Sequence, residues 1–201
     1  MRPFAYKDKK RKAELLIAKK EKEMSNPLNT MMGALCFVWI FFLLGSTVIS
    51  FTDYSIGIKM ISLTIASLSF GPLLGVIMIQ MDENDGLRIL KLTVAITFLA
   101  ALIGIYSGLD FSWLGFVLII PLFLLVTWNF LNIFYNFSGW AKRLGGVFGS
   151  GIFTLYLLYD FNRLERAAEN GLNDWNTAFE IGLSIYLDVI NLLLELLEAM
   201  G

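Results

Sequence analysis

The sequence predicts an all-α fold, a polytopic transmembrane helical bundle of about six spans. Two observations, the apolar blocks and the composition, support this prediction. Six apolar blocks of at least 19 residues occur at 31–51, 56–81, 88–107, 111–135, 144–162 and 177–199, and as helices each can cross about 30 Å of hydrocarbon. Hydrophobic residues make up 57% of the chain, and the 16% that are charged lie mostly outside the blocks. Asp188 lies near the middle of the sixth block, where a charge is costly unless it faces a partner or a water-filled cavity.

A basic tail, residues 1–26, precedes the predicted transmembrane domain, 27–201. Nine of the 16 Lys and Arg residues precede residue 23. The apolar run AELLIA is too short for a secretory signal. We expect a polar helix from about Lys9 to Glu23 on the cytoplasmic or matrix side, held at an anionic lipid surface or by a partner subunit, with a solvated tail as the alternative. Nucleic acid is not an expected partner, because lysines beside a membrane more often meet lipid headgroups or acidic proteins.

The first five blocks carry start and packing signals. Ser25–Pro27 is typical of a helix start, so the first span should begin near Pro27. Glycines with small-xxx-small spacing occur at Gly71 and Gly75, and again at Gly145 and Gly149. This spacing indicates close helix contacts, which we assign to packing within the bundle rather than to dimerisation.

The charges between the blocks predict the topology. If the N-terminus lies on the positive side of the membrane, the loops at 82–87 and 136–143 share that side. The opposite side then receives mainly Arg163 and Arg166. Both termini should therefore lie on the cytoplasmic side, or on the matrix side of a mitochondrial membrane.

The last two blocks contain the most specific sequence pattern. Tyr159-Asp160 stands near the end of the fifth block, and Leu187-Asp188-Val189-Ile190-Asn191-Leu192 stands in the sixth. These segments resemble the Bax inhibitor family, also called the transmembrane Bax inhibitor motif proteins. The similarity extends weakly upstream through LSFGPLLG and LDFSWLGFVLIIPLFLLVTWNFLNIFY.

The resemblance implies a bundle around the last span in which Asp160 and Asp188 share a proton when closed and gate a pH-sensitive calcium leak. Two close carboxylates at low dielectric cannot both ionise easily. If the fifth helix runs on to Asn170 with Gly171 as its left-handed cap, the two aspartates reach similar depth. Ca²⁺ suits such oxygens, although two carboxylates alone make a weak site, so no firm metal site and no cofactor are predicted.

A structural interpretation of the same residues stays open. In it Asp160 pairs with Arg163 one turn later, Asp188 bonds a neighbouring helix, and the two act as a polar lock. Glu195 and Glu198 are interpreted as the fraying polar end of the last helix, and Thr177 with Glu180 as its capping box. We assign these glutamates no role in a site.

The chain departs from the family pattern in its number of spans. Seven spans are usual and six are present here, so that an early arginine-bearing segment is missing and Lys59 is the basic residue in a comparable place. The lost span also reverses the orientation, because family topology puts the 163–176 loop on the cytoplasmic side. A family member recruited as a scaffold would show such losses.

Two functions therefore follow from the sequence. The first is a Bax-inhibitor-like calcium or proton leak. The second is a non-catalytic subunit of a larger membrane assembly, such as a mitochondrial respiratory complex, bound through the tail and the glycine-rich faces. The mitochondrial inner membrane is favoured over a bacterial inner membrane. We expect no enzyme, because histidine is absent, Cys36 is the single cysteine, and no nucleophile or nucleotide motif occurs.

Overall fold

A computed structural model describes residues 30–49, 52, 54–81, 83–135, 137–172 and 174–200. The basic tail, its predicted helix and the predicted helix start at Ser25–Pro27 lie outside these residues. The chain divides into two compact units. One contains Met1–Thr52 and Ile61–Gln80, and the other contains Asp53–Met60 and Met81–Gly201.

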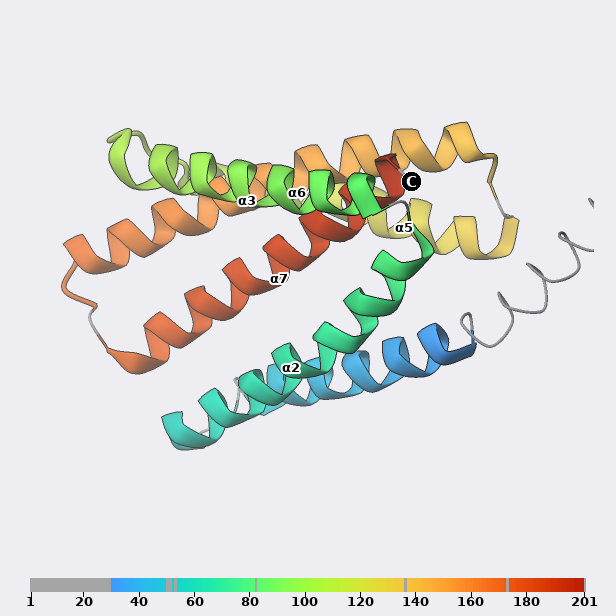
Figure 1. Cartoon of the computed structure of the whole chain (residues 1–201). Helices are drawn as coiled ribbons and strands as arrows, with labels where there is room; N and C mark the ends of the chain where they lie inside the picture. The colour runs from blue at the N-terminus through green and yellow to red at the C-terminus, as the bar shows by residue number, and fades with distance from the viewer. Residues whose placement is uncertain are drawn as a thin grey trace, which may run out of the picture. The chain divides into compact units, whose positions relative to one another are not determined.

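The first unit is a pair of apolar helices. Its first helix is Thr30–Ile49, and its second is most of α2, Ile56–Gln80 (Figure 1). The rings of Trp39 and Phe70 pack with centroids 5.1 Å apart. The hydroxyl of Ser62 donates a hydrogen bond to Ser46 Oγ at 3.2 Å, so a polar contact as well as ring packing holds this pair together.

The second unit contains the other helices. They are α3 (Glu83–Tyr106), α4 (Ser112–Val117), α5 (Ile119–Tyr135), α6 (Gly139–Glu169) and α7 (Trp175–Met200). The predicted block 111–135 is thus divided at Leu118 into two helices. The block 144–162 belongs to a helix that extends beyond it at both ends, and the side chain of Ser138 accepts a hydrogen bond from the N–H of Ala141 at its start.

The helix α6 is the centre of the second unit. It packs most extensively against α7 and α3, and also contacts α4 and α5. Figure 1 shows α6 and α7 as an antiparallel hairpin with α3 beside α6. As the sequence predicts, Asn170 ends α6 and Gly171 adopts a positive φ of 71°. The N–H of Leu172 donates to Ala167 O at 2.9 Å, which closes the turn into α7.

Asp174 caps the start of α7. Its Oδ1 accepts from the backbone N–H groups of Asn176 and Thr177, each at 3.0 Å, and its Oδ2 accepts from the Thr177 hydroxyl at 2.7 Å. These bonds, led by the one from the Thr177 side chain, lower the pKa of Asp174. The predicted capping box is therefore wrong, because the helix begins at Trp175 and Thr177 lies inside it.

The described residues form helices without strands, so the predicted all-α class is confirmed. Five helices are long and apolar enough to cross a membrane, at Thr30–Ile49, Ile56–Ile79, Asn84–Tyr106, Ser112–Asn132 and Gly139–Glu169. Large apolar side chains point outward from them, including Phe37, Tyr106 and Phe116, as expected for helices that face lipid. The helix α7 has a comparable length, 26 residues, but carries several acids and buries much of its surface against its neighbours.

Candidate functional site

The carboxyl groups of Asp160 and Asp188 meet between α6 and α7. The two residues are only 4% and 9% exposed, and their side chains lie within hydrogen-bonding reach of each other. They meet because α6 and α7 are antiparallel and both aspartates lie roughly 14–20 Å from the end of the hairpin, at about 1.5 Å per helical residue. A hydrogen bond between two carboxyl groups needs a proton on one of them.

Tyr156 lies beside the pair, one helical turn before Asp160. Its half-buried side chain interacts electrostatically with both carboxyl groups. The Oδ2 atom of Asp188 is buried and has no hydrogen-bond partner among the described residues. The pair therefore keeps one free acceptor oxygen inside the bundle, which can receive a proton, a water molecule or a cation.

Arg163 lies closest to Glu180 and not to Asp160, the acid with which the structural interpretation paired it. Its Nη2 is 3.9 Å from Oε2 of Glu180, and both side chains are about half exposed. Arg163 acts on Asp160 only through its charge, whereas Asp188 is the hydrogen-bonding neighbour of Asp160. An exposed pair such as Arg163–Glu180 contributes at most about 1 kcal/mol to stability.

Lys59 reaches the start of α7 rather than its middle. Its Nζ donates to Asn176 Oδ1 at 3.4 Å. Asp188 is three helical turns further along α7, about 18 Å at 1.5 Å per residue. Lys59 therefore does not take the place of the arginine that the family resemblance associates with the aspartates.

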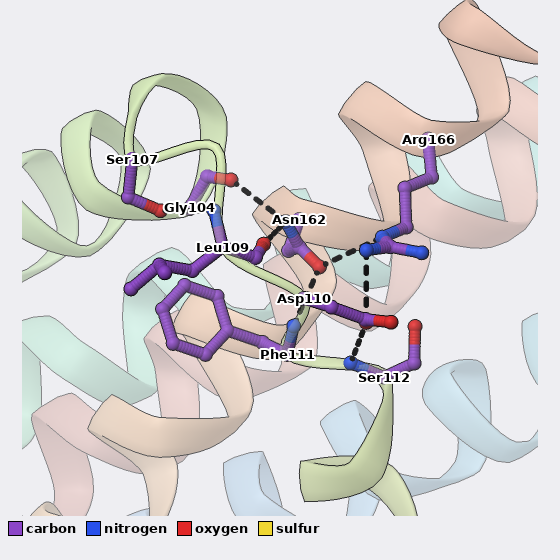
Figure 2. Close-up of polar contacts among 8 residues, drawn as sticks. All are labelled: Gly104, Ser107, Leu109, Asp110, Phe111, Ser112, Asn162 and Arg166. Atoms are coloured by element: carbon purple, nitrogen blue, oxygen red, sulfur yellow. Dashed lines mark hydrogen bonds and ion pairs between the residues drawn. The ribbon is translucent and has the colours of Figure 1, made fainter.

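Asn162, two residues after Asp160, is the centre of a second polar cluster (Figure 2). The side chain is 3% exposed. Its Nδ2 donates to the carbonyl oxygens of Gly104 at 3.1 Å and Leu109 at 3.0 Å. Its Oδ1 accepts from the N–H of Phe111 at 3.1 Å and from Arg166 Nε at 3.2 Å. One side chain thus fastens the loop between α3 and α4 to α6.

An ion pair completes this cluster. Arg166 Nη2 lies 2.9 Å from Asp110 Oδ1, and the same oxygen accepts from the N–H of Ser112 at 2.8 Å. The bonds from Ser112, together with the nearby guanidinium, lower the pKa of Asp110. The role of Asn162 was not predicted from the sequence, and Arg166 was predicted only to contribute to the topology. The one available clue was the spacing of four residues between Asn162 and Arg166, which follow shortly after Asp160.

Glu195 is the third polar residue inside the unit. It is 7% exposed, and its Oε1 accepts from Asn129 Nδ2 of α5 at 3.1 Å. Its Oε2 is buried without a hydrogen-bond partner among the described residues. The interpretation of Glu195 as part of a fraying polar end is therefore wrong. The helix continues to Met200 and packs this carboxyl group against α6.

The glycine-rich face of α6 explains how Glu195 is accommodated. A Cβ added at Gly149 would overlap the Glu195 carboxyl group, and one at Gly146 would come within 2.6 Å of backbone atoms of α7. A Cβ at Gly145 would lie 2.7 Å from the indole nitrogen of Trp128. The predicted packing role of Gly145 and Gly149 is confirmed, and their face is filled by α5 and α7 rather than available to another subunit.

The described residues contain no cluster of three or more His, Cys, Asp or Glu side chains that could hold a metal ion. Ca²⁺ takes six to eight oxygen ligands, of which Asp160 and Asp188 supply only a part.

Apolar helices around a buried pair of facing carboxyl groups define a polytopic membrane protein with an acidic centre between its last two helices. Residues 15–201 match the family model described as "Inhibitor of apoptosis-promoting Bax1". The chain therefore belongs to the Bax inhibitor family, as its C-terminal motifs indicated. It is also similar to a BI1-like protein of Arabidopsis thaliana, with 27% identity over 188 residues that cover 87% of this chain and 69% of the relative.

Proposed function

We propose that this protein is a pH-sensitive leak for calcium ions or protons, gated by Asp160 and Asp188, and that it is not an enzyme. The observation that carries the proposal is the meeting of two buried carboxyl groups between α6 and α7. Ionisable residues inside a membrane domain are costly, so they commonly mark an ion or proton pathway. Membership of the Bax inhibitor family supports the same assignment.

The gating step is the loss of the proton that the two carboxyl groups share. While the proton is present, a hydrogen bond joins α6 to α7. When it leaves to water, two carboxylates face each other at low dielectric and repel. Separation of the helices relieves this repulsion and admits water and a cation to the carboxylates, so cation flux should increase as the pH rises.

The Asn162 cluster determines which helix moves. Asn162 ties α6 to the loop between α3 and α4 at a point two residues from Asp160. The start of α7 is joined to α6 by a short turn, and Asp188 lies far from that turn. We therefore assign the movement to the part of α7 around Asp188, with α6 as the fixed partner.

Calcium flux into liposomes that contain the full chain tests this function. Measured from about pH 6 to about pH 8, flux should increase as the pH rises, because the pair loses its shared proton. Asp188→Asn should remove the pH dependence, since an amide bonds Asp160 at every pH. Glu180→Gln, an exposed acid of the same helix, is the matched control and should behave as wild type. Absence of flux from the unmodified protein across this range would contradict the proposal.

A second candidate is a non-catalytic subunit of a larger membrane assembly, for example in the mitochondrial inner membrane. One observation favours it. Within the first unit, a Cβ added at Gly71 or Gly75 of α2 would meet no atom within 4 Å, so this small-xxx-small face is not used to pack the helix pair and has room for another helix. Blue-native electrophoresis of the native membrane separates the candidates. Migration at the mass of the chain alone, without partners, would exclude the subunit.

A further inference from the structure

The carboxyl group of Glu195 is a buried acid that lies apart from the aspartate pair. The residue is buried, one carboxyl oxygen has a single amide partner and the other has none. We propose that Glu195 is a second proton-binding carboxyl group of the membrane domain, separate from Asp160 and Asp188, with Asn129 as its hydrogen-bonding partner. This inference does not depend on the proposed leak.

In the part of the chain that the structure describes, no positive charge is found to act on Glu195. From α6 it faces Gly149, from α5 it faces Asn129, and the one charged group among the described residues that acts on it is Glu198 of its own helix. A buried carboxylate without a cation beside it is strongly disfavoured relative to the neutral acid. A bound proton therefore neutralises the Glu195 carboxylate, as a neighbouring lysine or arginine would otherwise do.

Asn129 can form a hydrogen bond with Glu195 whether the carboxyl group is protonated or ionised. Its Oδ1 is also buried without a hydrogen-bond partner. The oxygen and nitrogen of an amide exchange places by a half turn. Turned in this way, Asn129 would present its oxygen 3.1 Å from Glu195 Oε1, where Nδ2 now lies, and would accept a hydrogen bond from the protonated carboxyl group.

A metal ion fits this place less well than a proton. The Oε2 side of the carboxyl group occupies the space that a Cβ at position 149 would fill, and glycine offers no side-chain ligand there. Glu195 and Asn129 supply too few oxygens for Ca²⁺, which takes six or more. A proton needs only the carboxyl oxygen that holds it and one acceptor.

Glu198 provides a route from Glu195 to water. It lies one turn further along α7 and lines a cavity of about 550 Å³ together with Gly139, Trp140, Lys142 and Arg143. A proton can pass from the Glu198 carboxyl group to the Glu195 carboxylate without any redox change. Asp188 lies two turns away in the other direction on the same face of α7, about 10 Å at 1.5 Å per residue. Glu195 therefore stands between this cavity and the aspartate pair.

Infrared spectroscopy of the reconstituted full chain tests the proposal through the C=O band of protonated carboxyl groups, identified by its shift in D₂O. The background is the variant Asp160→Asn/Asp188→Asn, which removes the pair. At about pH 7 we expect one protonated carboxyl group to remain there, and adding Glu195→Gln should remove its band. Adding Glu180→Gln instead should leave it. A background without the band, or a band that survives Glu195→Gln, would overturn the proposal.

Two glycine variants of the same helix test the location. The added Cβ of Gly149→Ala would overlap the Glu195 carboxyl group, whereas that of Gly151→Ala would meet nothing within 4 Å. We expect Gly149→Ala to shift the frequency of the Glu195 band and Gly151→Ala to leave it unchanged. Equal spectra for both variants would place the proton elsewhere. Absence of calcium flux would refute the proposed leak yet leave these spectra as expected, so the two proposals fail separately.

Discussion

Asn162 uses the full hydrogen-bonding capacity of its side-chain amide. The buried amide makes two donor bonds and two acceptor bonds to three backbone groups and one guanidinium. Buried backbone groups outside regular helices need such partners, because they have no neighbour in a helical ladder. A single asparagine therefore allows the loop between α3 and α4 to lie against α6 at little cost.

Asn162→Leu tests this role. Leucine has a similar size but leaves the carbonyl of Leu109 and the N–H of Phe111 without the bonds they now make. Each buried group left unsatisfied costs about 1–3 kcal/mol, so we expect a clear fall in the denaturation midpoint in detergent. Asn170→Leu, at the exposed end of the same helix, should change stability by less than about 0.5 kcal/mol. Equal effects would show that the bonds of Asn162 contribute nothing.

The ion pair of Asp110 with Arg166 should depend on pH. The pKa of Asp110 is lowered from 3.8 in the folded protein. A group with a lowered pKa stabilises the fold above its unfolded pKa, and this stabilisation disappears as the pH falls through the folded value. The stability difference between wild type and Asp110→Asn should therefore be constant near neutrality and decrease below pH 3.8. Asp85→Asn, which breaks a longer contact of 3.8 Å with Arg88, should give a smaller difference throughout.

At the scale of elements, glycines determine how closely α6 approaches its neighbours. Gly146 and Gly149 leave room for α7 to approach α6 closely, and Gly104 of α3 leaves room for the backbone of α6. Helices in a membrane gain stability mainly from such close packing, because lipid provides no hydrophobic drive for them to associate. The same contacts bring α6 near enough to α7 for Asp160 to reach Asp188.

Gly104→Ala should loosen the contact between α3 and α6. The added Cβ would lie 2.8 Å from Phe161 Cβ and 2.9 Å from Leu158 O, and overpacking of this kind costs about 1–3 kcal/mol. Thermal unfolding in detergent should show a lower midpoint. Gly182→Ala of α7, where a Cβ meets nothing within 4 Å, should be neutral or slightly stabilising because alanine favours helix. An unchanged midpoint for Gly104→Ala would mean that α3 and α6 can move apart without a loss of stability.

Apolar block length predicted where the helices lie, and the motif around Asp188 predicted which helices pair. The division of one block at Leu118 was not predictable, because the apolar run continues through Val117, Leu118 and Ile119 without a polar residue. Nor was the burial of Glu195. A glutamate five residues from a helix end is usually solvated, and only the glycine face of α6, distant in the sequence, encloses it. Side-chain environments of this kind depend on which helix faces meet, and hydrophobic pattern alone does not specify that.

At the scale of the whole molecule, the helices of the second unit alternate in direction. The end of α3 lies beside the end of α6, because Asn162 binds the loop between α3 and α4. The loop at 107–111 and the end of α6 at Asn170 therefore lie at the same end of the helical bundle. The start of α6 lies at the other end, where its residues Lys142 and Arg143 add positive charge.

Cysteine labelling tests this orientation, since Cys36 is the single native cysteine and Cys36→Ser gives a clean background. A membrane-impermeant maleimide should label Leu109→Cys and Leu172→Cys from the same side in sealed vesicles. It should label Trp140→Cys from the other side. The charge distribution predicts that the Trp140 side is cytoplasmic or matrix. Labelling of Leu109→Cys and Trp140→Cys from one side would contradict the alternating arrangement.

The contact between Gly149 and Glu195 also constrains how the two positions can evolve. A side chain at position 149 and a carboxyl group at position 195 compete for the same volume, so neither can change freely while the other stays. In descendants of this protein we expect an alanine or serine at 149 to appear together with a shorter or apolar residue at 195. Correlated substitution at positions 149 and 195 among related sequences would then mark the lineages that have lost the buried acid.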